Sequence, residues 1–140
     1  NQIIDQKNKI IKIGSTNTKR DFLYVEDTVD AYIKIINKKK SFGQTYNIGT
    51  GFEISIKDLI YKIVKLSGKK NIIIKNQNKR NRPKKSEVMR LLCDYSKIKR
   101  EIGWKPKIKS KKDFDKYLLE TIEWYKHNNH KFINKNNYYV

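Results

Sequence analysis

Arginine and glutamate stand at intervals that suit a grip on a nucleotide diphosphate. Arg82 and Arg90 bracket Glu87, and Arg20 follows a polar loop early in the chain. A guanidinium holds phosphate oxygens bidentately, and a carboxylate can accept hydrogen bonds from both hydroxyls of a ribose. We therefore predict that the loop from Arg82 to Asp94 closes over a nucleotide diphosphate. The alternative is that these arginines are scattered surface charges or local ion-pair partners of Glu87.

The composition suits one domain with a strongly basic surface. The chain has 140 residues and a formal net charge of +19, enough length for a single core. Such a charge raises nucleic-acid binding as an alternative function. Because lysine is spread along the whole chain, an ordinary lysine-rich surface explains the charge better, and we expect no dedicated nucleic-acid module.

Cysteine usage and hydropathy bear on the compartment. The single cysteine, Cys93, allows no disulfide framework, which favours a reducing compartment, and we expect Cys93 to be a small apolar filler. No apolar run approaches the roughly 18–20 residues needed to cross a bilayer. We therefore expect a cytoplasmic protein that does not contact membranes.

The periodicity of apolar residues alternates between strand and helix, which predicts an α/β fold. The expected strands are 9–13, 44–48 and 71–75, and 20–25 is expected to be extended. The expected helices are one from Glu26 to the lysines at 38–40, one from Ser55 to Gly68, one at 95–102 capped by Asp94, and one at 111–127 capped by Ser110. Residues 76–93 are predicted to be a loop, and 128–140 a frayed polar tail.

Four further motifs suggest chemistry and have simpler explanations. Gly49-Thr50-Gly51 lies between an expected strand and a helix, but it is neither a dinucleotide fingerprint nor a P-loop, so a tight turn is favoured over a phosphate site. Tyr61/Lys65 and Tyr95/Lys99 have the Tyr-x-x-x-Lys spacing of short-chain dehydrogenases, which chance explains in a chain rich in both residues. His127 and His130 are not accompanied by a third ligand cluster, so no metal site is predicted.

Three motifs in a fixed order resemble the extended short-chain dehydrogenases that act on sugar nucleotides, the NAD-dependent epimerase/dehydratase family. The motifs are the segment from Arg20 to Ala31, the segment from Tyr46 to Gly51, and a block that runs from Arg82-Pro83 through Ser86-Glu87-Val88, Arg90-Leu91 and Gly103-Trp104 to Pro106. The form of that block is most similar to the nucleotide-sugar 4,6-dehydratases of the UDP-N-acetylglucosamine and GDP-mannose types. The resemblance covers residues 1–127, and Thr121 to Trp124 match the last helix of the family.

The resemblance implies roles for individual residues. Arg20 and Arg82 match the two arginines that contact the substrate diphosphate, Glu87 matches the acidic residue on the ribose hydroxyls, and Arg90 aligns with a further arginine of that site. The implied fold is the C-terminal substrate-binding portion of a Rossmann-type enzyme. The implied reaction is oxidation at C4 of the sugar by NAD, loss of water across C5–C6, and return of hydride to C6.

The resemblance also implies what this chain should not do alone. The glycine-rich NAD turn, the catalytic Tyr-x-x-x-Lys pair and the elimination acid of the family belong to an N-terminal portion that these residues do not match. We therefore expect residues 1–127 to bind an NDP-sugar in a homodimeric enzyme whose NAD and catalytic groups are held elsewhere. An inactive truncated gene product is the remaining alternative.

Overall fold

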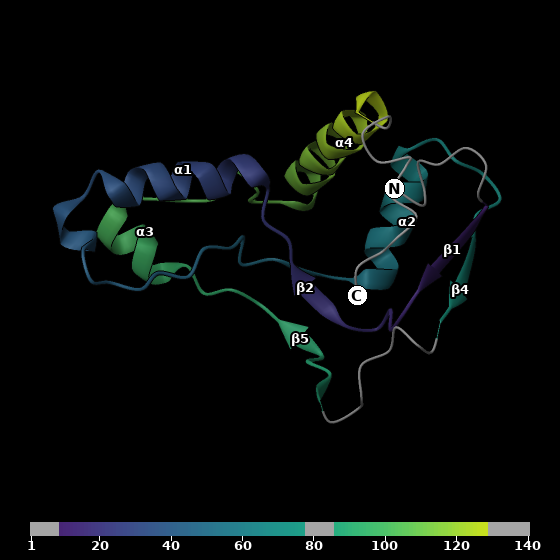
Figure 1. The fold of residues 1–140 in the computed structure, drawn as a ribbon, viewed down its shortest axis with the longest axis horizontal. Coiled ribbons are helices and arrows are strands. Elements are labelled where there is room, and N and C mark those ends of the chain that lie inside the picture. Colours follow the sequence, from purple (N-terminus) through teal and green to yellow (C-terminus); the bar gives the residue numbers. More distant parts are fainter. Residues whose placement is uncertain (1–8, 78–85, 129–140) are drawn as a thin grey trace.

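The computed structural model describes residues 9–77 and 86–128. In chain order the elements are β1 Ile10–Ile13, β2 Lys19–Asp21, α1 Val25–Ile36, the 3-10 turn η1 Lys39–Ser41, β3 Glu53–Ser55, α2 Ile56–Leu66, β4 Ile73–Asn76, β5 Arg90–Leu91, α3 Ser96–Ile102 and α4 Lys111–His127. Figure 1 shows an elongated arrangement, with α1 and α3 at one end and β1, β4 and α2 at the other. The predicted α/β fold class is confirmed.

Two small sheets organise the chain. In the first, β1 and β4 pair in parallel, with Ile10 opposite Ile73. Helix α2 packs against this pair, where Ile11 and Ile60 form a small core. A parallel pair needs a crossover connection, and α2 lies within it. The short isoleucine-rich runs of 9–13 and 71–75 therefore predicted both strands correctly.

The second sheet has the strand order β3-β2-β5 and holds two of the predicted site residues, Arg20 and Arg90. Strand β2 runs antiparallel to β3 and parallel to β5, with Arg20 opposite Ile54 and Leu91. Arg90 stands opposite Lys19. Because successive side chains point to opposite faces of a strand, Arg90 shares a face with Lys19, and Arg20 belongs to the other face.

The core of the α1 end is built around a fully buried tryptophan. Trp104 packs with Ala31 of α1 and with Ile98 of α3, and its indole Nε1 donates to the backbone carbonyl of Asp27 at 3.2 Å. The buried Asp27 carboxylate accepts from the backbone N–H of Lys107 at 2.8 Å. The segment that follows α3 is thereby fastened to the first turn of α1.

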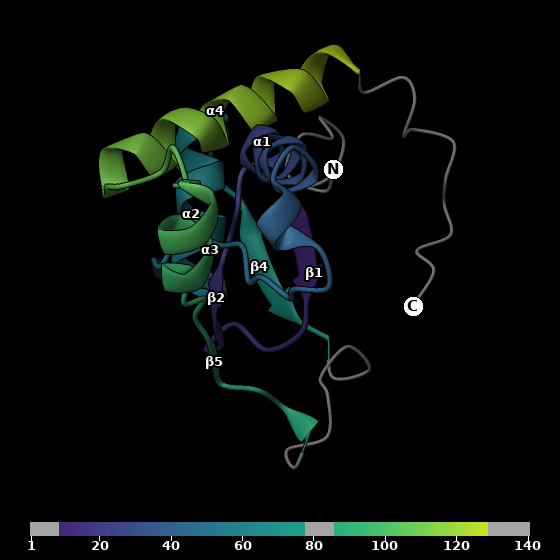
Figure 2. The same ribbon diagram turned by 90° about the vertical axis from the view of Figure 1, so that its left-hand side faces the viewer.

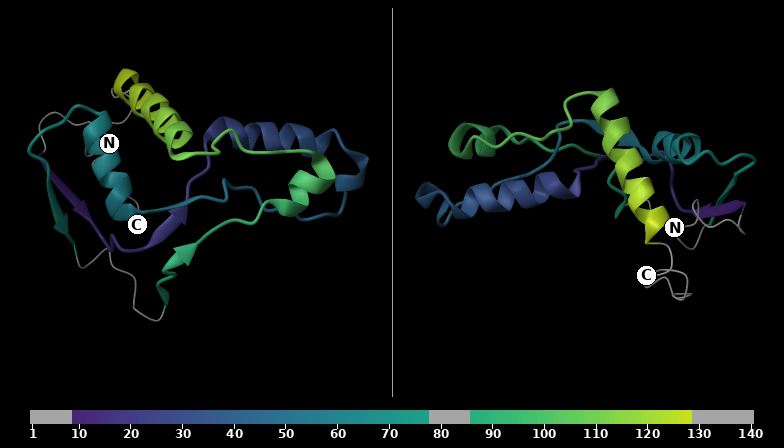
Figure 3. Two further views of the ribbon diagram at one scale, coloured as in Figure 1. Left: turned by 180° about the vertical axis from the view of Figure 1, so that it is seen from behind. Right: turned by 90° about the horizontal axis from the view of Figure 1, so that it is seen from above.

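Helix α4 packs against the middle of the molecule. Its Phe114 joins Ile54 of β3 and Ile108 in a third core. Tyr117, also on α4, stacks on Tyr24 with ring centroids 4.7 Å apart. The views in Figures 2 and 3 show α4 lying across the other elements, between the end that holds α1 and α3 and the end that holds β1 and β4.

The predicted helix ends were largely correct. Ser55 and Ser110 each accept a hydrogen bond from the backbone N–H three residues on, which satisfies a donor in the open first turn. Gly68 and Gly103 adopt left-handed φ values of 71° and 79° behind their helices. Asp94 lies one residue before the N-cap Tyr95, and its carboxylate accepts from the N–H of Ser96 at 2.8 Å.

Two expectations about strands were wrong. Residues 44–48 do not form a strand in the described structure, because β-structure needs a hydrogen-bonded neighbour and none lies beside them among the described residues. Conversely, β3 and β5 were missed, since strands of two or three residues are too short to show a periodicity. The 76–93 stretch is therefore not wholly a loop, and the expected 128–140 tail lies almost entirely outside the described residues.

The apolar stripe that predicted α1 is exposed. Its five residues keep between 51% and 72% of their surface accessible: Val25, Val29, Tyr32, Ile33 and Ile36. The buried positions of α1 are instead Ala31 and Asp27. Helical spacing identified the helix correctly, but it did not identify the side that packs within the described residues.

Truncation of Asp27 should destabilise the protein more than its amidation. Asp27→Ala leaves the N–H of Lys107 without its acceptor, which should cost about 1–3 kcal/mol. Asp27→Asn keeps an acceptor oxygen and removes a carboxylate whose pKa is raised, chiefly by desolvation on burial. Urea unfolding at neutral pH would compare the two variants with the wild type. Equal stability of Asp27→Ala and the wild type would contradict this account.

Candidate functional site

Two of the predicted site residues meet in the structure. Arg20 of β2 and Glu87, just before β5, are 67 positions apart, yet Arg20 Nη2 lies 3.3 Å from Glu87 Oε1. Their side chains are 23% and 15% exposed. Arg20 Nη1 also donates to the carbonyl of Lys19 at 2.8 Å. Arg82 lies outside the described residues, so its part in the site stays a prediction.

Arg90 contacts a different glutamate. Its Nε lies 3.1 Å from both carboxylate oxygens of Glu53, and its Nη2 lies 2.8 Å from one of them. Lys19 of the central strand adds a weaker contact of 3.6 Å to the same carboxylate. These hydrogen bonds and charges hold the pKa of Glu53 below its ordinary value. Arg90 therefore ties β5 to β3 across β2, and the structure does not bring it to Arg20 or Glu87.

The carboxylate of Asp21 occupies the glycine turn. It accepts from the backbone N–H groups of Thr50 and Gly51, each at 2.9 Å at its closer oxygen, and from the Thr50 hydroxyl. The N–H of Cys93 adds a contact at 3.3 Å. Because Thr50 and Gly51 already donate to an internal anion, these two N–H groups are not open to a phosphate. This arrangement favours the predicted tight turn over the phosphate-loop alternative.

Gly49 lets two chain segments touch. A Cβ at this position would lie 2.3 Å from Cys93 Cβ and 2.7 Å from its Sγ, far inside van der Waals contact. Burial, followed by the nearby charges of Asp21 and Asp94, raises the pKa of the Cys93 thiol. The thiol is thus disfavoured as a thiolate and acts as a packing group, as the sequence predicted.

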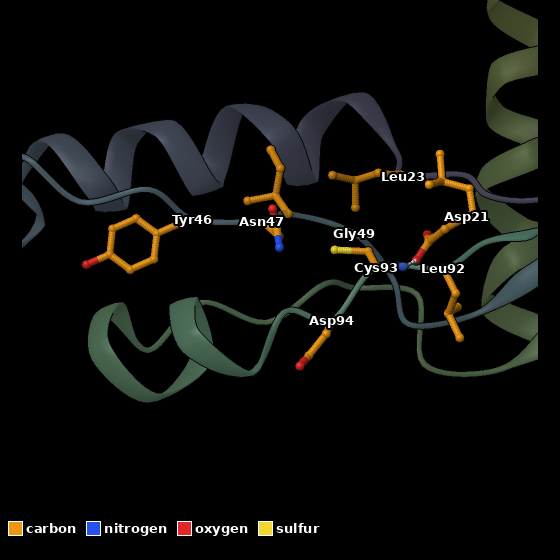
Figure 4. A pocket seen from close by; sticks show the side chains of 10 residues that line it. Asp21, Leu23, Tyr46, Asn47, Gly49, Leu92, Cys93 and Asp94 are labelled. Atoms are coloured by element: carbon orange, nitrogen blue, oxygen red, sulfur yellow. Dashed lines mark hydrogen bonds between the residues drawn. The ribbon is translucent and has the colours of Figure 1, made fainter. Parts of the chain in front are cut away.

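An open groove of about 430 Å³ runs beside this contact. Tyr46 and Asn47 line it from the extended segment before the turn, and Leu92, Cys93 and Asp94 line it from the segment after β5. Figure 4 shows these side chains around the groove, with the Asp21 carboxylate directed at the backbone N–H of Cys93. The groove was not predicted, because its two walls are about 45 residues apart in the sequence.

Comparison with known proteins identifies the family. The family model described as "GDP-mannose 4,6 dehydratase" matches residues 1–116. The chain belongs to this family. It is thus a member of the NAD-dependent epimerase/dehydratase group of short-chain dehydrogenases, of the nucleotide-sugar 4,6-dehydratase type, as the motifs predicted.

Curated relatives are dehydratases and epimerases. Human "dTDP-D-glucose 4,6-dehydratase" is 35% identical over 125 residues, which are 86% of this chain and 33% of that protein. A "Putative UDP-glucose 4-epimerase" of Methanocaldococcus jannaschii is 33% identical over 119 residues, 85% of this chain and 35% of the relative. The chain spans about a third of the length of these relatives.

Solved structures of this family share the fold. The UDP-glucose 4-epimerase of Bifidobacterium longum, in complex with NAD+ and UDP, has a TM-score of 0.76 at 22% identity, over 94% of this chain and 39% of that one. The dTDP-glucose 4,6-dehydratase of Bacillus anthracis, in complex with NAD, has a TM-score of 0.68 at 28% identity, over 86% and 35%. The chain therefore shares its α/β fold with a portion of these Rossmann-type structures.

The remaining sequence candidates concern a metal site and a membrane-spanning helix. No group of three or more metal-ligating residues occurs within 9–77 and 86–128, and of the two histidines His130 lies outside these ranges. His127 Nδ1 lies 2.7 Å from the carbonyl of Glu123 within α4. None of the helices in the same two ranges is long and apolar enough to cross a bilayer.

Gly49→Ala should destabilise the protein through a steric clash with Cys93. We expect a loss of about 1–3 kcal/mol, the usual cost of overpacking. The double variant Gly49→Ala/Cys93→Gly removes the Cys93 side chain that the new Cβ would meet, so it should recover much of this loss. Cys93→Gly alone is the control. Thermal unfolding would measure all three. Additive effects in the double variant would show that the contact is not the cause.

The Glu53 ion pair should make stability depend on pH. Because the folded-state pKa of Glu53 lies below its ordinary 4.5, the stabilisation is present above that value. It is lost as the pH falls through the lower, folded-state pKa. The wild type should therefore exceed Glu53→Gln in stability at neutral pH, and the difference should shrink under acid. Urea unfolding from about pH 7 to pH 3 tests this, and a constant difference would count against the ion pair.

Proposed function

We propose that this chain binds the diphosphate and the ribose of an NDP-sugar for an NAD-dependent nucleotide-sugar 4,6-dehydratase or epimerase. The observation that carries the proposal is the meeting of Arg20 and Glu87 at 3.3 Å, although 67 positions separate them. One supplies a planar cation for phosphate oxygens, and the other a carboxylate for vicinal hydroxyls. Solved relatives are described with UDP-glucose and with UDP, which supports a ligand of this class.

The two other predicted residues have different standing. Arg82 is proposed as the second diphosphate arginine, on the family motif alone. Arg90 is proposed to act indirectly, because its guanidinium is engaged with Glu53 and its position opposite Lys19 places it on the face away from Arg20. It would hold β5, and hence the segment that carries Glu87, beside β2.

Glu87 favours a ribonucleotide as the ligand. A carboxylate can accept from both the 2′ and the 3′ hydroxyl of a ribose, whereas deoxyribose offers only one of them. We therefore propose a UDP- or GDP-linked sugar rather than a dTDP-linked sugar, although several curated relatives are described as dTDP-glucose dehydratases.

The proposed NAD does not fit the described glycine turn. The N–H groups of Thr50 and Gly51 are taken by Asp21, so NAD would be held by other residues of the enzyme, together with the groups that perform the reaction. This chain would contribute by orienting the sugar nucleotide. A cytoplasmic homodimer completes the proposal, on the family resemblance and on Cys93 as the single cysteine.

Titration calorimetry with UDP, GDP and dTDP tests the binding role. Arg20→Lys keeps the charge but loses the planar fork. It should weaken UDP or GDP binding by about ten- to a hundredfold, as expected for a hydrogen bond to a charged group. Arg100→Lys is the matched control, since Arg100 lies on α3 and contacts Glu101. Equal affinity of Arg20→Lys and the wild type for all three nucleotides would refute the proposal.

A further inference from the structure

The arginine proposed to hold the diphosphate already holds an anion. Arg20 donates from Nη2 to the Glu87 carboxylate at 3.3 Å and from Nη1 to a backbone carbonyl at 2.8 Å. Both side chains of the pair are mostly buried, at 23% and 15% exposure, so solvent screens their attraction less than it would at the open surface. A phosphate group that approaches Arg20 therefore meets a carboxylate bound to it.

Glu87 can leave Arg20 without disturbing the sheet. The contacts of β5 with β2 begin at Met89, whose carbonyl accepts from the N–H of Lys19, and continue at Arg90 and Leu91. Glu87 lies outside this ladder. Its carboxylate can therefore turn away while the backbone that carries it stays paired with β2.

Arg90 does not take part in this exchange between Glu87 and a phosphate. Its guanidinium is held by three contacts of 2.8–3.1 Å to the Glu53 carboxylate, and the strand register places it on the opposite face. Among the described arginines, Arg20 is thus the one for which Glu87 and an incoming phosphate would compete.

We propose that Glu87 is a specificity-determining residue that acts by competition for Arg20. In the unliganded protein its carboxylate occupies the guanidinium and disfavours simple anions. A nucleoside diphosphate with two ribose hydroxyls displaces the carboxylate and then satisfies it through those hydroxyls. Ligands that offer only the anion break the ion pair and leave Glu87 without a new partner. This inference rests on the proposed function. It adds that Glu87 weakens the binding of simple anions and strengthens the binding of a nucleotide with both ribose hydroxyls.

Calorimetry of the purified protein with inorganic pyrophosphate, UDP and 2′,3′-dideoxyuridine diphosphate tests the competition. In Glu87→Gln, pyrophosphate should bind about two- to fivefold tighter, the value of a partly exposed ion pair. UDP should bind about tenfold weaker or more, through loss of a charged hydrogen-bond acceptor. The dideoxy nucleotide should also bind more tightly to Glu87→Gln, as pyrophosphate does, because it lacks both hydroxyls.

Glu26→Gln is the matched control. It makes the same change in net charge at an exposed glutamate whose partner is Lys107, and it should leave all three affinities unchanged. Equal tightening of pyrophosphate in this control would trace the effect to net charge and overturn the inference. Glu87→Asp, which keeps the charge but shortens the reach to Arg20, serves as a second variant and should also tighten pyrophosphate.

The failures of the two proposals can be told apart. If Glu87→Gln weakens UDP but leaves pyrophosphate unchanged or weaker, the competition is wrong and the binding role stands. If neither Arg20→Lys nor Glu87→Gln changes the affinity for UDP or GDP, the binding role itself is wrong, and so is the competition.

Discussion

The carboxylate of Asp21 connects three segments that the chain order keeps apart. From the end of β2 it accepts hydrogen bonds from the turn at Thr50 and Gly51 and from Cys93 beyond β5. Thr50 is buried, and leaving its backbone N–H unpaired would be costly. The positions of β2, the turn and the segment after β5 therefore depend on this one side chain. Arg20, its immediate neighbour, is placed by the pairing of β2 with β3 and β5.

The charged residues of the second sheet divide between its two faces. One face carries the Lys19, Glu53 and Arg90 cluster, which links all three strands. The opposite face carries Arg20, which reaches Glu87. Two arginines with the same sequence-level prediction therefore have different surroundings. Arg90 is engaged with Glu53 in joining strands, whereas Arg20 is the arginine proposed to exchange Glu87 for a ligand. Arginine content alone could not separate these two uses.

Part of the fold was readable from local patterns, because the interactions behind those patterns are local. Ser55 and Ser110 cap helices through bonds to residues three positions on. The short isoleucine-rich runs of 9–13 and 71–75 predicted β1 and β4. The strand expected at 44–48 failed because pairing depends on a neighbour, and the described residues supply none. The apolar stripe of α1 gave the helix correctly and its packing side incorrectly, since the described core takes Ala31 and Asp27 instead.

For the candidate site, the sequence by itself determined the residue types and the family. The ordered motifs around Arg20 and Glu87 are signals in the sequence itself, and the family model confirmed the family that they indicated. Only the tertiary structure decided which residues meet. It joined Arg20 to Glu87 and Arg90 to Glu53, and it filled the glycine turn with Asp21. The physical reason is that strand register and long-range hydrogen bonds select partners dozens of residues apart. The spacing of residues along the chain does not encode either of them.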